Sequence, residues 1–158
     1  MQTIELICIG KLGAGFYGEG CAEYIKRLKP FYNLKISELP ETRLLEDNTA
    51  GRLKVIESES RLIASRLKGA ARTAALCVEG KSLTSEELAR FIKEAALDSR
   101  PLAFIIGGSL GLTEELKQSC GLRLSLSAMT LPHKLARLVL LEQIYRAATI
   151  NNNIKYHK

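Results

Sequence analysis

The sequence lacks the long apolar runs that membrane proteins need. A membrane-spanning helix requires roughly 18 consecutive apolar residues. The longest apolar stretch, near the C-terminus, is interrupted by Lys134, Arg137, Glu142 and Arg146. The first apolar segment contains Glu5 and has neither a basic start nor a cleavage site, so it does not match a signal peptide. These absences predict a cytoplasmic protein.

Metal-binding and disulfide patterns are missing as well. None of the four cysteines shows C-x-x-C spacing, and the two histidines have no cysteine neighbours. Cys8 and Cys77 lie in apolar runs, where a thiol most often serves as a small buried hydrophobe. We therefore expect no metal and no disulfide. Aromatic residues make up only 6% of the chain, which argues against a protein that binds single strands by base stacking.

The chain does carry an excess of positive charge, and most of it lies near the C-terminus. The net charge is +6, and residues 123–158 contain six Lys or Arg against one Asp or Glu. A basic balance often serves solubility alone, but its concentration in one region is also typical of proteins that bind nucleic acid. With 158 residues, of which 46% are hydrophobic, the chain is expected to form a single domain, 1–158.

Short apolar runs alternate with helical patterns along the chain. Strands are expected at 3–10, 34–40, 73–80, 102–108 and 122–127, and helices near 17–29, 46–68, 84–98, 113–118 and 132–149. Several runs are apolar throughout, which is typical of strands covered on both faces. Thr84 with Glu87 has the pattern of a capping box at the start of one expected helix, and Thr113 is expected at the start of another. This alternation predicts an α/β fold in which helices cover both faces of a mostly parallel sheet, giving three layers.

The last helix is apolar around most of its circumference, unlike a helix with one buried face. It is therefore either central in one domain or packed between its own sheet and a partner subunit, and its terminal place favours the partner. Glu142 and Arg146 stand four residues apart and are expected to form an ion pair.

Two segments are candidate sites. The stretch "FIIGGSLGLTEE" carries a buried strand into Gly107 and Gly108 at the carboxyl end, where parallel sheets bind ligands, although a tight turn without a ligand would look the same. Neither it nor "EGKS" has the glycine spacing of a dinucleotide fold or a phosphate-binding loop. In the second segment, small and hydroxyl residues lead to Pro132 and His133 at the mouth of the last helix. His133 is a candidate site residue, or a helix-terminal residue whose ring bonds the loop.

The stretches "CIGKL", "AEYIKRL", "FIIGGSLGL", "LSLSAMTLPHKLARLVLLEQIYRA" and the terminal "YHK" closely resemble the ribosomal large-subunit methyltransferase H family of SPOUT methyltransferases. The resemblance covers the whole chain. It implies a homodimer whose C-terminal half forms a trefoil knot holding S-adenosylmethionine, although chain knots are rare in general. Cofactor contacts are then expected at Leu76, Gly108, Ser127, Ala128, Met129, Thr130, Leu131 and Pro132. A valine at position 108 would be expected to occupy the space of the cofactor.

The resemblance also implies the reaction, which is methylation of ring nitrogen N3 of a pseudouridine in the helix 69 loop of 23S rRNA, on the large ribosomal subunit or the assembled ribosome. That nitrogen must lose a proton, and a positioned base contributes about 10²–10⁴-fold. The candidates are His133 and the tail residues Tyr156 and His157, which would reach in from the other subunit. Arg137, Arg146 and Lys158 are expected to contact RNA.

The chain departs from its relatives at two places. Relatives usually have an acid after the strand leucine, whereas Cys77 follows Leu76 here, and the segment before the tail reads "NNN" where relatives have a glycine and a proline. The alternative function is a dimeric RNA-binding or ribosome-associated module that has lost catalysis.

Overall fold

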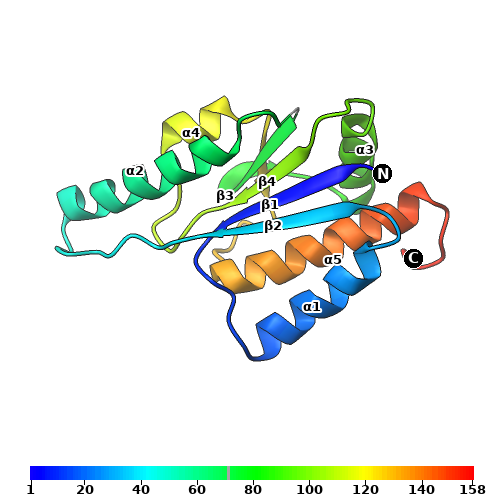
Figure 1. Cartoon of the computed structure of the whole chain (residues 1–158), viewed down its shortest axis with the longest axis horizontal. Coiled ribbons are helices and arrows are strands. Elements are labelled where there is room, and N and C mark those ends of the chain that lie inside the picture. The colour runs from blue at the N-terminus through cyan, green and yellow to red at the C-terminus, as the bar shows by residue number, and fades with distance from the viewer. Residues whose placement is uncertain (71) are drawn as a thin grey trace.

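The computed structural model describes residues 1–70 and 72–158, and it confirms the expected alternation of strands and helices. The strands are β1 (Thr3–Ile9), β2 (Asn33–Leu39), β3 (Arg72–Ser82), β4 (Leu102–Ile106) and β5 (Leu122–Ser125). The helices are α1 (Phe16–Leu28), α2 (Thr49–Arg66), α3 (Ser85–Ala95), α4 (Glu114–Ser119) and α5 (His133–Asn151). Each lies within a few residues of its predicted range (Figure 1).

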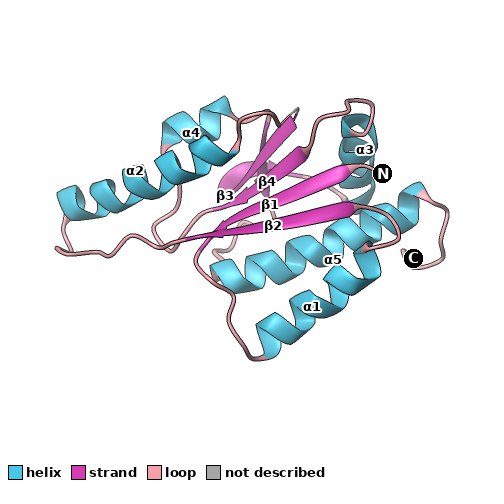
Figure 2. Ribbon diagram, viewed as in Figure 1, coloured by secondary structure: helices cyan, strands magenta, loops and turns pink. Residues whose placement is uncertain are grey.

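The five strands form one parallel sheet in the order β2-β1-β4-β3-β5. Every residue of β4 is buried, which explains why its sequence is apolar without alternation. Because all strands run the same way, their carboxyl ends meet at one edge of the sheet (Figure 2). Side chains that follow different strands in sequence are thereby brought together.

Helices cover both faces of the sheet, so the predicted three layers are confirmed. Alternate residues of β1 point to opposite faces. Leu6 and Cys8 join a cluster with α1, α3 and α5, whereas Ile7 and Ile9 join a second cluster with α2 and α4. Figure 1 shows α2 and α4 on one side of the sheet and α1 and α5 on the other. The core is therefore divided into two halves by the sheet.

Helix α5 packs on the sheet between α1 and α3. Leu140, Leu141, Ile144 and Ala147 are fully buried, whereas many of its other residues, such as Val139, are only partly covered. Some of the apolar circumference noted in the sequence is thus explained by contacts within the chain. The partly covered residues of α5 offer a surface for the predicted contact with a partner subunit.

Local signals at the helix ends are confirmed. Thr84 and Glu87 form both hydrogen bonds of a capping box at α3, and Thr113 accepts a hydrogen bond from the N–H of Leu116 at α4. Pro132 differs slightly from its expected place, because it precedes α5 as its N-cap and the helix begins at His133. Within the described residues, no helix has the length and apolarity needed to cross a membrane, and no group of His, Cys, Asp or Glu side chains could hold a metal ion.

Candidate functional site

A pocket of about 760 Å³ lies beside the ends of β4 and β5 and the middle of β3. Its walls come from three segments: residues 76–79 of β3, the turn between β4 and α4, and the connection from β5 into α5. The sequence had pointed to the last two segments separately, and the parallel sheet joins them. Most of the lining side chains are apolar or small, and the lining includes Cys77, Val78, Glu79, Ile106, Gly107, Ser109, Leu110, Gly111, Leu112, Lys117, Leu124, Leu126 and Ala136.

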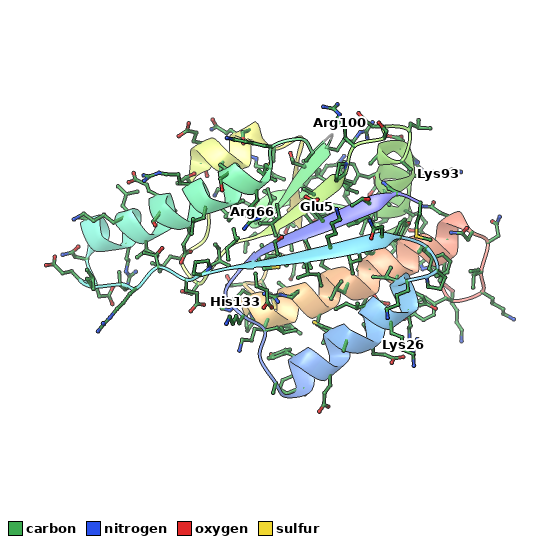
Figure 3. The ribbon with its side chains drawn as sticks, in the orientation of Figure 1. Glu5, Lys26, Arg66, Lys93, Arg100 and His133 are labelled. Carbon is green, nitrogen blue, oxygen red and sulfur yellow. The ribbon has the colours of Figure 1, made fainter. Side chains whose placement is uncertain are left out.

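Seven of the eight residues expected to contact the cofactor line this pocket: Leu76, Gly108, Ser127, Met129, Thr130, Leu131 and Pro132. Ala128 does not line it and is exposed. His133, the first residue of α5, lines it as well, and Figure 3 labels this side chain at the amino end of the helix. The structure therefore assembles one site from residues up to 60 positions apart, Leu76 to Ala136.

Hydrogen bonds from two serines shape the connection between β5 and α5. The buried Ser125 hydroxyl lies 2.9 Å from the carbonyl oxygens of Val78 and of Ser127, and it can donate its single proton to either one. The Ser127 hydroxyl accepts a hydrogen bond of 3.0 Å from the N–H of Met129. The loop is thereby tied to the end of β3 and folded on itself. No side chain caps α5, so first-turn N–H groups of this helix stay available beside the pocket.

Gly108 lines the pocket and is also close-packed on the side facing α2, which gives a second reason why a side chain is excluded there. An added Cβ would lie 2.7 Å from Oε2 of Glu59 and 3.2 Å from Cγ2 of Ile9. It would therefore meet this buried carboxyl, and the overlap of a valine with the cofactor stays a prediction. Glu59 is only 3% exposed and accepts a hydrogen bond from the N–H of Thr42, while its Oε2 has no partner among the described residues.

Gly108→Val is therefore expected to lower the free energy of unfolding by about 1–3 kcal/mol, because overpacking forces Glu59 or the turn to move. Urea denaturation measures this loss. Ser109→Val is the matched control, because Ser109 is exposed and its substitution should leave stability nearly unchanged. If Gly108→Val instead keeps the stability of the parent protein and loses ligand binding, overlap with the cofactor alone would explain why a side chain is excluded.

A pH-dependent contribution of Glu59 to stability is also expected. Burial raises the pKa of this carboxyl above its usual value of 4.5, against the opposing hydrogen bond from Thr42. The folded state thus binds a proton more tightly than the unfolded state, and the stability gained below pH 4.5 is lost as pH rises through the raised pKa. Relative to the parent protein, Glu59→Gln should become more stable from about pH 4.5 to neutral pH. Thermal melts across this range test it, and parallel pH profiles would contradict it.

Arg137 does not face solvent, which contradicts its expected contact with RNA. The residue is 2% exposed, and its guanidinium forms an ion pair with Glu38 and donates a 3.0 Å hydrogen bond to the carbonyl oxygen of Gly10. Glu38 also accepts the N–H of Leu12 at 2.9 Å. Arg137 therefore joins the start of α5 to the ends of β1 and β2 and acts inside the fold.

The C-terminal tail packs at the end of α5 far from the pocket. Helix α5 spans 19 residues, about 27 Å from its first to its last Cα, and the chain terminus lies at the opposite end of the helix from His133 (Figures 1 and 3). The Tyr156 hydroxyl donates to Glu142 at 3.0 Å, and His157 lies 2.8 Å from Glu86. Neither tail residue reaches the pocket of its own chain.

Arg146 lies beside the tail. It forms the expected ion pair with Glu142, at 2.5 Å, and stacks 4.7 Å from the centre of the Tyr156 ring. Burial, followed by hydrogen bonds with Tyr24 and Glu142, raises the pKa of Tyr156. In this conformation Tyr156 keeps its proton at neutral pH and is a poor base. Contacts of Arg146 and of the exposed Lys158 with RNA remain predictions.

Two charged residues of the pocket wall were not predicted from the sequence. Glu79 and Lys117 are 38 positions apart and form an ion pair there. Lys117 lies in the last turn of α4, where a cation is usual, so its sequence context gave no signal of a site. Cys77, where relatives have an acid, also lines the pocket, and burial raises the pKa of its thiol. Both thiols were expected to be buried. Cys8 is fully buried, whereas Cys77 is only half-buried.

Comparison with known proteins identifies the class to which this fold and pocket belong. The family model described as "Predicted SPOUT methyltransferase" matches residues 1–157. The chain belongs to this family.

Curated relatives narrow the family further. The ribosomal RNA large subunit methyltransferase H of Lactococcus lactis subsp. lactis is 41% identical over 159 residues, and that of Clostridioides difficile is 40% identical. Both alignments cover 99% of this chain and the full length of the relative. Within the SPOUT methyltransferases, the chain therefore belongs to the ribosomal RNA large subunit methyltransferase H family.

Solved structures share the fold at low sequence identity. A methylase family protein from Haemophilus influenzae has a TM-score of 0.62 at 14% identity, over 99% of this chain and 71% of that chain. A methyltransferase from Legionella pneumophila, solved with bound S-adenosylmethionine, has a TM-score of 0.50 at 17% identity, over 93% of this chain and 66% of that chain. These similarities support the fold alone.

Proposed function

We propose that this chain is an S-adenosylmethionine-dependent methyltransferase that modifies ring nitrogen N3 of a pseudouridine in the helix 69 loop of 23S rRNA. Its substrate would be the large ribosomal subunit or the assembled ribosome, in the cytoplasm. The carrying observation is the pocket in which the "GGSLG" turn and the 127–132 segment meet. Full-length similarity to rRNA large subunit methyltransferases supports the assignment.

The pocket suits this cofactor. Its volume of about 760 Å³ lies within the range of about 300–1,000 Å³ for small-molecule sites. Leu76, Ile106 and Leu126 offer apolar walls for an adenine ring, and the N–H groups that start α5 offer hydrogen-bond donors. When bound, S-adenosylmethionine supplies a sulfonium methyl group for transfer to a nucleophilic nitrogen.

The residues of this chain would then contribute by positioning and proton transfer. The shape of the pocket holds the reacting groups in line, which supplies much of the rate enhancement. His133 lines the pocket and can accept the proton of the ring nitrogen. Tyr156 and His157 are the other candidates, and each lies too far away to serve the pocket of its own chain.

We further infer a homodimer in which each tail completes the site of the other subunit. The partly covered face of α5 offers a contact surface. If two α5 helices cross in opposite directions, the tail of one subunit is brought toward the start of α5 in its partner. The tail packs on the second half of α5, against Glu142 and Arg146, and lines no part of its own pocket, which supports exchange between subunits.

The C-terminal half is proposed to form a trefoil knot within the single domain 1–158. β5 pairs with β3 on both sides of a register shift between Leu76 and Lys81, and Ser125 bonds to the carbonyl of Val78. The chain that enters α5 thus stays against residues 77–81 of β3, as a threaded segment would.

Calorimetry and a transfer assay together test the proposed function. The protein should bind S-adenosylmethionine and transfer a labelled methyl group to ribosomes purified from a strain that lacks this protein. Ribosomes from the parent strain are the control and should accept little label, because their site is already modified. Cofactor binding without transfer to any ribosomal substrate, or no binding at millimolar cofactor, would instead favour a ribosome-associated module without catalysis.

A further inference from the structure

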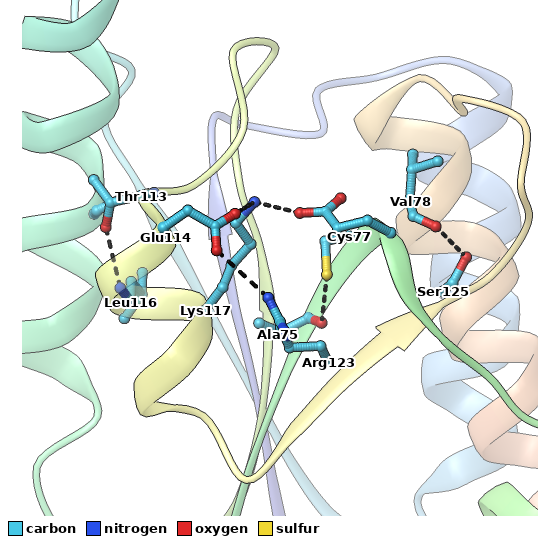
Figure 4. A network of polar contacts seen from close by, with 11 residues as sticks. Ala75, Cys77, Val78, Thr113, Glu114, Leu116, Lys117, Arg123 and Ser125 are labelled. Atoms are coloured by element: carbon cyan, nitrogen blue, oxygen red, sulfur yellow. Dashed lines mark hydrogen bonds and ion pairs between the residues drawn. The ribbon is translucent and has the colours of Figure 1, made fainter.

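Glu79 and Lys117 are the only Asp, Glu, Lys or Arg residues among the described residues that line the pocket. Glu79 lies near the end of β3, and Lys117 lies on α4 at the neighbouring wall. The ammonium group of Lys117 lies between two carboxylates, those of Glu79 and Glu114. Figure 4 labels Lys117 and Glu114 in this network. The other lining residues are apolar, small or uncharged polar, apart from His133. Charge is therefore confined to one part of the wall.

Lys117 is well enclosed, whereas its partners are open to solvent. Its side chain is 13% exposed, compared with 51% for Glu79 and 62% for Glu114. Burial alone would lower the pKa of Lys117, but hydrogen bonds to the two carboxylates outweigh this effect and raise it. The bond from Lys117 in turn lowers the pKa of Glu79. Both side chains are therefore charged at neutral pH.

The ammonium group retains binding capacity. A lysine has three N–H donors, and two of them are directed to Glu79 and to Glu114, the latter at 2.8 Å. Because the Glu79 and Glu114 side chains are half exposed or more, solvent screens their attraction to Lys117, and the pair contributes less to stability than a fully buried one. Placed in a pocket wall, it presents one positive and one negative group side by side.

We propose that Lys117 and Glu79 bind the amino-acid end of the cofactor, with the ammonium of Lys117 on its α-carboxylate and the carboxylate of Glu79 on its α-ammonium. This inference rests on the proposed function of the pocket. An α-amino acid is a zwitterion whose charges are separated by one carbon, and an adjacent ion pair of opposite charges is complementary to it. The apolar walls and the 127–132 segment are left for the adenosine end.

Ligands that differ in this end test the proposal. S-adenosylmethionine carries the amino-acid group, whereas 5′-methylthioadenosine has the adenosine and the methylthio group without it. Because 5′-methylthioadenosine also lacks the sulfonium charge, S-adenosylhomocysteine, a neutral thioether with the same amino-acid group, is measured alongside and should respond to each variant as S-adenosylmethionine does. Lys117→Met keeps the length of the alkyl chain and removes the charge. Calorimetry should show that Lys117→Met weakens S-adenosylmethionine by roughly 10- to 100-fold, as for a lost charge-assisted hydrogen bond, and leaves 5′-methylthioadenosine unchanged.

Arg123→Met is the matched control. Arg123 pairs with Glu114 in the same network, at 3.4 Å, but does not line the pocket, so its removal should leave both affinities unchanged. Glu79→Gln is a second probe on a half-exposed residue whose substitution leaves the core intact. It should weaken S-adenosylmethionine selectively as well.

The outcomes separate the two proposals. Selective loss of S-adenosylmethionine in Lys117→Met and Glu79→Gln supports the assignment. Equal losses for both ligands, or none, would overturn it, because the ion pair would then be only part of the wall. A parent protein that binds neither ligand would instead contradict the proposed function of the pocket.

Discussion

Deletion of residues 155–158 is expected to reduce methyl transfer by about 10²–10⁴-fold while cofactor affinity stays unchanged. The tail carries two of the three candidate bases, and none of its residues lines the pocket of its own chain. Stability should fall by only about 1 kcal/mol, because the Tyr156 ring, 4.9 Å from the Tyr145 ring, is the main packing contact that is lost. Transfer assays, calorimetry and thermal melts measure the three quantities.

Tyr156→Phe and His157→Ala serve as matched variants. Tyr156→Phe keeps the packing on Tyr145 and removes the hydroxyl, whereas His157→Ala removes the imidazole that contacts Glu86. The variant that reproduces the activity loss of the deletion identifies the group concerned. Full activity in the deleted protein would exclude the tail from the reaction.

Mixing two inactive proteins tests exchange between subunits. The deleted protein keeps an intact pocket, and Ala136→Phe, designed to fill the pocket, keeps an intact tail. A mixed dimer would hold one complete site if the tail serves its partner, and partial activity should return. Continued inactivity after verified subunit exchange would mean that each tail serves its own subunit or that both sites must be intact.

Arg137→Met is expected to destabilise the protein by about 2–3 kcal/mol, because it removes a charge-assisted hydrogen bond to Glu38 and a second hydrogen bond to the Gly10 carbonyl oxygen. Arg137 is 2% exposed, whereas Glu38 is 33% exposed and keeps its hydrogen bond from the N–H of Leu12, so the remaining carboxylate is partly compensated. For a chain of this size the melting temperature should fall by roughly 5–10 °C. Differential scanning calorimetry measures this change.

Arg146→Met is the control for Arg137→Met. Arg146 also pairs with a glutamate, but its side chain is 25% exposed, so its removal should cost only about 1 kcal/mol. Equal effects of the two substitutions would show that burial does not set the contribution of Arg137.

The secondary structure and the three layers were predictable because they follow from local periodicity. The continuously apolar strand at 102–106 indicated a doubly covered strand, and the Thr84–Glu87 pair marked the start of α3. The 127–132 segment was found through its similarity to a family, and its place beside Gly108 follows from the parallel sheet. The strands, the helices and the helix caps depend on residues that are close in sequence.

Features that depend on distant partners were not predictable. Arg137 looked like an exposed cation one turn after His133, but its partner Glu38 lies 99 residues away. Glu59 of α2 fills the space next to Gly108, and the spacing of glycines in the sequence gives no sign of this contact. The same holds for Lys117 and Glu79, which only the strand order β4-β3-β5 brings to one wall.

Mass spectrometry of 23S rRNA shows whether this protein methylates the helix 69 loop in the cell. Fragments covering the helix 69 loop would be compared between a strain that makes this protein, a strain that lacks it, and the second strain supplied with either the intact protein or Lys117→Met. The expected result is a methylated pseudouridine that disappears with the protein and returns with the intact form, more weakly with Lys117→Met. An unchanged methylation pattern throughout the rRNA of the strain that lacks the protein would contradict the account.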